Sequence, residues 1–224
     1  MKITLYGDSI LKGVVLEDGK YRMDRRWEQR LCDEYGLVIK NSSHFGSTIG
    51  KALPLIRRDS EKDFEAGEIA VLEFGGNDCD YDWAAISADP DRSHDCKTPP
   101  ALFRRQYREA VELIRRSGRC PVILTLPPIH SLRYLQFICR NGLSRQSILR
   151  WLGDVEAICR WQAAYSDMAL EIAQREGVRM LDLRGAFLRD GRSLEELLCA
   201  DGIHPSRLGQ GIIFDAAAAA IARA

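Results

Sequence analysis

Residues 1–10 of the chain read MKITLYGDSI, a short apolar run that leads directly into a turn. Residues 3–6 have the composition of a buried parallel strand, and Gly7, Asp8 and Ser9 follow without a break. Ser9 is therefore expected in a tight strand-to-helix turn, with its hydroxyl at the carboxyl end of the strand. Taken alone, this triplet favours an ordinary turn, because all three residue types stabilise turns.

Further apolar runs along the chain have the same character and are bounded by Gly, Asn or Pro. They cover Val38–Asn41, Ile69–Phe74, Val122–Leu126 and Val178–Leu183. Helical patterns lie between them, including one that begins at Pro99 or Pro100 and ends at Gly118, and the last helix is expected to begin at Pro205. Parallel strands need crossover helices on both faces. This order therefore predicts an α/β fold, a three-layer α/β/α sandwich around a five-stranded parallel sheet.

Composition limits the classes of protein to which the chain could belong. It has 224 residues, 46% of them hydrophobic, and 32 basic side chains balance 32 acidic ones. One domain spanning residues 1–224 buries a sufficient core without support from disulfides or metals. A neutral chain argues against a nucleic-acid binder, which would carry an excess of cations to neutralise phosphates.

The distribution of cysteines and apolar residues bears on the compartment. The 7 cysteines are scattered and form no Cys-x-x-Cys pair, which is typical of free thiols in a reducing environment. No signal peptide is visible, because Asp8 breaks the apolar start, and no window approaches the roughly 20 apolar residues of a membrane span. We therefore expect a cytoplasmic protein without a membrane span, whose oligomeric state stays open.

The stretch DGIHP at residues 201–205 combines two groups that suit general-base catalysis. Asp201 stands three residues before His204, so a turn can bring its carboxylate onto one ring nitrogen and leave the other nitrogen free. The alternative interpretation is a helix cap formed by Asp201 beside a histidine that faces solvent.

Two further motifs follow strand ends and carry hydrogen-bond donors. The stretch GGND at residues 75–78 ends the third strand and offers close backbone approach together with the Asn77 amide, which suits a developing oxyanion. Gly46 follows the second strand and can present its backbone N–H to the same developing oxyanion. The alternative for both is a plain loop.

The four motifs together, in the order GDS, Gly, GGND and DxxH, resemble those of the SGNH hydrolases, the GDSL-type esterase and lipase superfamily. The resemblance spans residues 7–204, with Ile10 where the family name has Leu, an apolar exchange. It implies a flavodoxin-like, five-stranded parallel sheet. The Gly-x-Ser-x-Gly elbow of the α/β-hydrolases is not found around Ser9, which disfavours that other superfamily.

The resemblance also implies roles for individual residues. Ser9 would be the nucleophile, His204 the base and Asp201 the group that orients the base. The backbone N–H groups of Ser9 and Gly46 and the side chain of Asn77 would form the oxyanion hole. Such chemistry requires neither a metal nor an organic cofactor.

The implied activity is that of a serine esterase, with an acyl-enzyme on Ser9 and a small or carbohydrate-linked carboxylic ester as substrate. A thioesterase or lysophospholipase with the same triad stays an alternative, because fold and triad do not fix the substrate. A non-catalytic α/β protein that binds a ligand in the same crevice is the rival from another class. That rival has no need of Ser9, Asp201 and His204 together.

Two segments, residues 78–98 and 127–151, exceed the usual length of connections. Both leave the sheet from the edge that carries the motifs, so we expect them to cap the nucleophile and to restrict the pocket to short acyl groups. Tyr81, Trp83 and His130 lie on these segments and are the candidate substrate-binding residues.

Overall fold

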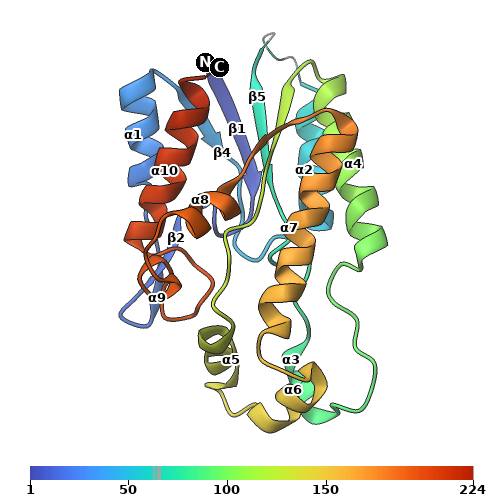
Figure 1. The fold of residues 1–224 in the computed structure, drawn as a ribbon. Helices are drawn as coiled ribbons and strands as arrows, with labels where there is room; N and C mark the ends of the chain where they lie inside the picture. The colour runs from blue at the N-terminus through green and yellow to red at the C-terminus, as the bar shows by residue number, and fades with distance from the viewer. Residues whose placement is uncertain (63, 65–66, 224) are drawn as a thin grey trace.

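The computed structural model describes residues 1–62, 64 and 67–223. Its main sheet contains β1 (Lys2–Gly7), β4 (Val38–Asn41), β5 (Ile69–Glu73), β6 (Cys120–Leu124) and β7 (Arg179–Leu181). The strands lie in the order β4-β1-β5-β6-β7, and every pairing is parallel (Figure 1). This is the flavodoxin-like order of a doubly wound sheet. The predicted five-stranded parallel sheet is therefore confirmed.

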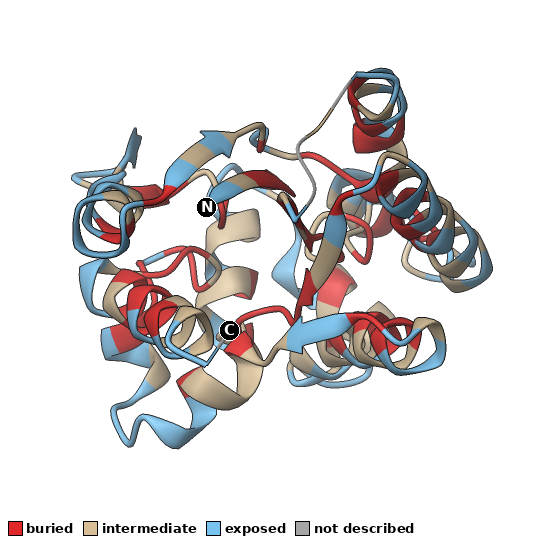
Figure 2. Ribbon diagram, turned by 90° about the horizontal axis from the view of Figure 1, so that it is seen from above, coloured by how far each residue is buried: buried red, intermediate tan, exposed pale blue. Residues whose placement is uncertain are grey.

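Helices cover both faces of the sheet and complete the three-layer sandwich (Figures 1 and 2). One face carries α1 (Arg26–Tyr35), α8 (Leu183–Arg189), α9 (Leu194–Leu197) and α10 (Arg207–Ile221), and the other carries α2 (Ile49–Ser60), α4 (Pro100–Arg116) and α7 (Ala157–Glu176). Each helical layer packs on the sheet through its own apolar core. One core surrounds Phe103 and Tyr107, and the other surrounds Leu31 and Ile213.

The helix boundaries follow from local signals in the sequence. Helix α4 begins at Pro100, whose missing N–H costs nothing in the first turn, and its buried face includes Phe103, Tyr107, Ala110 and Ile114 at spacings of three and four residues. Helix α7 ends where Gly177 adopts a left-handed conformation with φ 59°. These helices match the periodicity of the sequence.

The start of α10 differs from the sequence prediction, which placed Pro205 at the first helical position. Ser206 is the N-cap instead, and its side chain accepts a hydrogen bond from the Gly209 N–H. Pro205 pairs with Leu198 in an isolated antiparallel bridge. The proline therefore helps to close the loop of residues 199–204, which carries the Asp-x-x-His motif.

A small antiparallel sheet after β1 has no counterpart among the predicted elements. Its strands are β2 (Val14–Glu17) and β3 (Lys20–Met23), joined by Asp18 and Gly19. Both turn residues have positive φ angles, 51° and 70°. Asp-Gly is the signature of such a two-residue hairpin turn, so this signal was present in the sequence.

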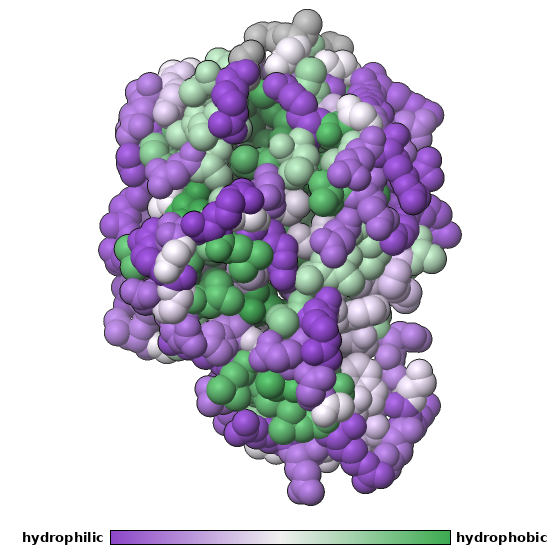
Figure 3. Space-filling view, in the orientation of Figure 1, coloured by the Kyte–Doolittle hydropathy of each residue, from purple (hydrophilic) through white to green (hydrophobic). Residues whose placement is uncertain are grey.

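Short helices extend beyond the carboxyl edge of the sheet, at the bottom of Figure 1. They are α3 (Trp83–Ala88), α5 (Ser131–Cys139) and α6 (Arg145–Leu152), which we call the cap. The cap has its own apolar cluster, in which Ile86, Leu135 and Ile148 are fully buried. Apolar side chains also gather on the surface of this lower part of the molecule, where α5 lies (Figure 3). Among the described residues, no helix combines the length and apolar character that crossing a membrane requires.

Candidate active site

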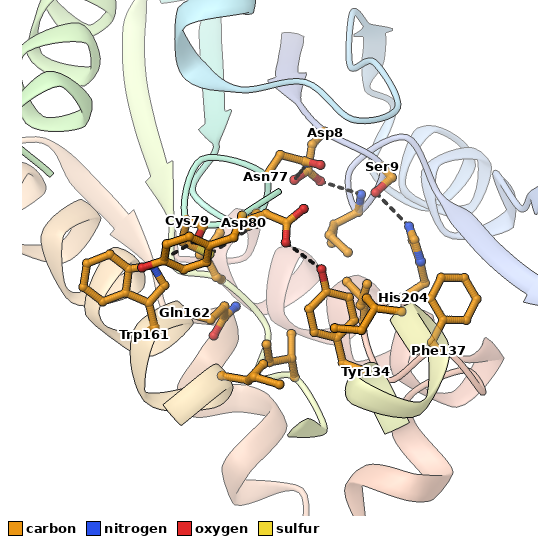
Figure 4. A pocket seen from close by; sticks show the side chains of 18 of the residues that line it. Asp8, Ser9, Asn77, Cys79, Asp80, Tyr134, Phe137, Trp161, Gln162 and His204 are labelled. Atoms are coloured by element: carbon orange, nitrogen blue, oxygen red, sulfur yellow. Dashed lines mark hydrogen bonds between the residues drawn. The ribbon is translucent and has the colours of Figure 1, made fainter. Parts of the chain in front are cut away.

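Ser9, His204 and Asp201 form a continuous chain of hydrogen bonds, and Figure 4 shows the one between Ser9 and His204. His204 Nε2 lies 2.8 Å from Ser9 Oγ, and His204 Nδ1 lies 2.7 Å from Asp201 Oδ2. A carboxylate can only accept a hydrogen bond, so Nδ1 of a neutral imidazole carries the proton and Nε2 accepts from the Ser9 hydroxyl. This is the arrangement of a nucleophile, a base and the group that orients the base.

The turn after β1 fixes the position of Ser9. Asp8 Oδ1 accepts a hydrogen bond of 2.8 Å from the Ile10 N–H, and Asp8 Oδ2 accepts one of 2.8 Å from Asn77 Nδ2. One buried carboxylate thus ties the turn that carries Ser9 to the turn that carries Asn77. Gly7 allows this close approach, because a Cβ there would lie 3.1 Å from the Glu73 carbonyl oxygen.

The loop before α10 holds the other two members of the chain. Asp201 Oδ1 accepts hydrogen bonds from the N–H groups of Ile203, at 3.0 Å, and His204, at 3.1 Å. Gly202 between them has φ 72°, and a Cβ there would lie 2.7 Å from the His130 carbonyl oxygen. Burial raises the pKa of Asp201, but the interaction with the His204 ring and the hydrogen bonds from the Ile203 and His204 N–H groups together outweigh burial and leave this pKa below its ordinary value. Asp201 is therefore ionised at neutral pH.

Hydrogen-bond donors line the cavity next to Ser9. Gly46 and Asn77 both belong to its wall. In the described part of the chain, the N–H groups of Ser9 and Gly46 donate no hydrogen bond to the protein. Asn77 uses one amide hydrogen on Asp8 and keeps the second one free. These donors suit an oxyanion beside Ser9.

A cavity of about 620 Å³ extends from Ser9 beneath the cap. Figure 4 shows Trp161 and Gln162 towards one end, and Ser9, His204 and Phe137 towards the other. Aromatic side chains form much of the wall, namely Tyr81, Trp83, Tyr134, Phe137, Trp151 and Trp161. The volume is in the range of pockets that enclose small organic molecules.

Comparisons with known proteins identify the family of the chain. The model of the GDSL-like lipase/acylhydrolase family matches residues 5–212. The chain belongs to this family. It is an ester hydrolase of the GDSL type. No curated protein matches its sequence.

Solved structures share the fold of this GDSL-type hydrolase. A lipase/acylhydrolase from Enterococcus faecalis aligns with a TM-score of 0.62 and 19% identity, over 98% of this chain and 94% of that one. An acetyl xylan esterase from Geobacillus stearothermophilus aligns with a TM-score of 0.68 and 16% identity, over 98% and 94%. An alpha/beta hydrolase enzyme from the metagenome of Lake Arreo gives 0.67 and 20%, over 99% and 94%. These likenesses confirm the fold.

Buried carboxyl groups lie next to the turns of the GDSL-type site. Burial raises the pKa of Asp8, and it raises the pKa of Asp78 to about 7. Burial and then the charge of Asp8 raise the pKa of Glu73 well above its ordinary value. Among the described residues, neither Glu73 carboxyl oxygen has a hydrogen-bond partner. Burial and the charge of Asp8 therefore favour the neutral form of Glu73, which carries no negative charge towards a nearby oxyanion.

The candidate substrate-binding residues lie in different places. Tyr81 and Trp83 belong to the cavity wall, whereas His130 is not among the lining residues. His130 is the N-cap of α5, and its Nε2 lies 2.6 Å from Glu195 Oε1. Its backbone N–H donates to the Gly202 carbonyl oxygen at 2.8 Å, so His130 supports the loop that carries the Asp-x-x-His motif. In the sequence, a histidine near a strand end is compatible with substrate binding and with support of a loop. Only its neighbours in space distinguish these two roles.

Other residues of the site were missed from the sequence. The Phe45 ring stacks on the His204 ring, with centroids 5.8 Å apart and an interplanar angle of 15°. Tyr21 meets both rings, with its centroid 5.1 Å from that of His204 and 5.2 Å from that of Phe45. The Asp-Gly turn signals the hairpin that carries Tyr21, but no local pattern shows that this hairpin folds towards His204. Trp151 and Trp161 also line the cavity.

Proposed function

We propose that this GDSL-type hydrolase cleaves carboxylic esters through an acyl-enzyme on Ser9. His204 acts as the general base and acid, and Asp201 holds it in the productive tautomer. The observation that supports this assignment is the pair of hydrogen bonds from Ser9 Oγ through His204 to Asp201, at 2.8 and 2.7 Å. Ser9 lies at the beginning of the chain, and Asp201 and His204 lie near its end. The packing of the fold does not by itself require these three side chains to be in contact.

In the first half of the reaction, Ser9 Oγ forms a bond to the carbonyl carbon and its proton moves to His204 Nε2. General-base help of this kind is worth about 10²–10⁴-fold in rate. The carbonyl oxygen becomes an oxyanion that accepts hydrogen bonds from the N–H groups of Ser9 and Gly46 and from Asn77. The bond to the alcohol oxygen then breaks, and His204 returns the proton to that oxygen.

The second half releases the acyl group. Water replaces the alcohol, gives a proton to His204 and attacks the acyl carbon. The bond to Ser9 Oγ breaks, Ser9 recovers its proton, and a carboxylic acid leaves. Each half uses the same donors for its oxyanion, and one such donor is worth about 10²–10³-fold in rate.

The alcohol portion of the ester is expected on the side of His204, which must protonate it. That side is open, since Phe45 is 53% exposed and Tyr21 is 40% exposed. Aromatic faces at an open rim offer apolar contact to an alcohol whose remaining parts stay in water. We therefore include small and carbohydrate-linked alcohols in the proposed substrate class.

The size of the acyl group depends on the space beside Ser9. The sequence favours short acyl groups, because two long segments were expected to restrict the pocket. The segments do contribute to its wall, but the cap helices pack around their own apolar cluster and leave about 620 Å³. The volume gives no support to a preference for acetyl groups.

The test is a panel of acyl esters assayed with the parent protein, Ser9→Ala and Ser43→Ala. Ser43 is a matched control, because it is buried at the same edge of the sheet and its hydroxyl has no hydrogen-bond partner among the described residues. We expect Ser9→Ala to lose nearly all activity and Ser43→Ala to keep it. A serine-directed fluorophosphonate should label every form except Ser9→Ala. Near-parental turnover by Ser9→Ala on all esters would exclude Ser9 as the nucleophile.

A further inference from the structure

The surroundings of Ser9 determine where the acyl chain must go. In the tetrahedral intermediate the reacting carbon carries Ser9 Oγ, the oxyanion, the alcohol oxygen and the acyl chain. The oxyanion faces the donors on Gly46 and Asn77, and the alcohol oxygen must face His204 to receive its proton. The acyl chain takes the remaining direction, away from His204 and into the part of the cavity beneath the cap (Figure 4).

Aromatic rings in contact with one another form the wall of that part. The centroid of the Tyr81 ring lies 4.8 Å from that of Trp151, 5.7 Å from that of Trp83 and 6.1 Å from that of Trp161. The first two contacts are edge-to-face, an arrangement that stabilises aromatic pairs. The wall is therefore packed from several elements and does not depend on a single mobile side chain.

Polar atoms of Trp83, Tyr134 and Trp161 in this wall already have partners within the protein. Asp80 Oδ1 accepts hydrogen bonds from Trp83 Nε1, at 2.8 Å, and from the Tyr134 hydroxyl, at 2.6 Å. Trp161 Nε1 donates to the Cys79 carbonyl oxygen at 2.9 Å. A sugar or a charged group would lose its hydration here and find few new partners, whereas an alkyl chain would lose nothing. The wall favours an apolar occupant.

We propose that the cavity beneath the cap is an acyl pocket that selects medium-length apolar acyl groups, from butyryl to octanoyl. This inference rests on the proposed role of Ser9. Each methylene that moves from water into the pocket is expected to raise kcat/KM by about fourfold. Trp151 and Leu152 on α6 belong to the wall of this cavity, and we expect no further increase for a palmitoyl group once the cavity is filled.

The first test measures kcat/KM of the parent protein for acetyl, butyryl, octanoyl and palmitoyl esters of one alcohol. We expect a rise from acetyl to octanoyl and no further rise to palmitoyl. A decrease from acetyl to butyryl would overturn the acyl pocket. A continued rise to palmitoyl would overturn the upper limit on acyl length.

The second test reduces the pocket and uses a matched control. Ala157 lines the cavity at the start of α7, and Ala84 is an exposed alanine on α3 of the cap. We expect Ala157→Phe to lower the ratio of octanoyl to acetyl kcat/KM by more than about tenfold, because the ring occupies space for several methylenes. Ala84→Phe should leave the ratio unchanged. An unchanged ratio in Ala157→Phe would place the acyl chain elsewhere.

Binding without turnover provides an independent measurement. Octanamide, a neutral mimic of the acyl group, is titrated into Ser9→Ala while tryptophan fluorescence is followed, because Trp83, Trp151 and Trp161 line the pocket. Saturable quenching that Ala157→Phe weakens supports the proposal, and its absence opposes it. Ser9-dependent hydrolysis with a preference for acetyl would overturn the pocket alone. Hydrolysis that persists in Ser9→Ala would overturn the proposed function itself.

Discussion

Replacing Asp201 by Asn tests how the site fixes the proton of His204. Asp201 Oδ1 accepts hydrogen bonds from two backbone N–H groups, and Oδ2 faces His204 Nδ1 at 2.7 Å. In Asp201→Asn the amide oxygen must stay with the two N–H donors, because the opposite orientation would leave both without an acceptor. The amide NH₂ then faces Nδ1, so Nδ1 must accept and Nε2 must carry the proton. His204 can no longer take the proton of Ser9.

The expected cost is a decrease in kcat of about 10⁴-fold, as for other triads with this change. That factor corresponds to about 5 kcal/mol of transition-state stabilisation. The fold should persist, because the backbone hydrogen bonds of the loop keep their acceptor. The assay is steady-state hydrolysis of a butyryl ester, with thermal unfolding as the check on folding.

Asp182→Asn is the matched control for this experiment. Asp182 is the N-cap of α8, where its side chain accepts a hydrogen bond from the Gly185 N–H, and Asn caps helices equally well. The control should keep the parental kcat. If Asp201→Asn kept kcat within tenfold of the parent at an unchanged Tm, the tautomer argument would be refuted.

Three further predictions concern the oxyanion hole, a buried acid and a glycine. Asn77→Ala should lower kcat by about 10²–10³-fold in steady-state assays, because one oxyanion donor is lost, and a change confined to KM would contradict that role. Burial raises the pKa of Asp78 from 3.8 to about 7, so the folded chain holds one proton more than the unfolded chain between these pH values. Stability should fall as pH rises through this window, by up to about 4 kcal/mol, and urea unfolding should show a smaller fall in Asp78→Asn. An equal fall in stability in the parent protein and in Asp78→Asn would assign the pH dependence to other groups. Gly202→Ala should lose about 2 kcal/mol or more in thermal unfolding, because its φ of 72° and the nearby His130 carbonyl oxygen exclude a Cβ. An unchanged Tm would show that the loop of residues 199–204 can move and make room for the new Cβ.

The edge of the sheet that carries the site could be predicted from the sequence. The runs that form β1, β4 and β5 are apolar and short, and each ends where a motif begins. Parallel strands bring their carboxyl ends to one edge, so Ser9, Gly46 and Asn77 had to lie near one another once the strands were recognised. The Asp-x-x-His motif was recognised through its spacing and its place before the last helix. These inferences rest on local periodicity and on the geometry of parallel sheets, which require no knowledge of individual contacts.

The layers of the fold and the residues that meet at Ser9 could therefore be predicted from local patterns. The walls of the cavity around these residues depend on tertiary packing. His130 and Tyr21 both lie near motifs, yet His130 caps a helix outside the cavity while Tyr21 contacts His204. Nothing in the sequence gives the volume beneath the cap, and nothing in it shows that the Glu73 carboxyl has no hydrogen-bond partner among the residues that the structure describes. Periodicity records which face of an element is apolar. The direction in which a loop or hairpin folds depends on packing between residues remote in sequence, and that packing sets the size and chemistry of the pocket.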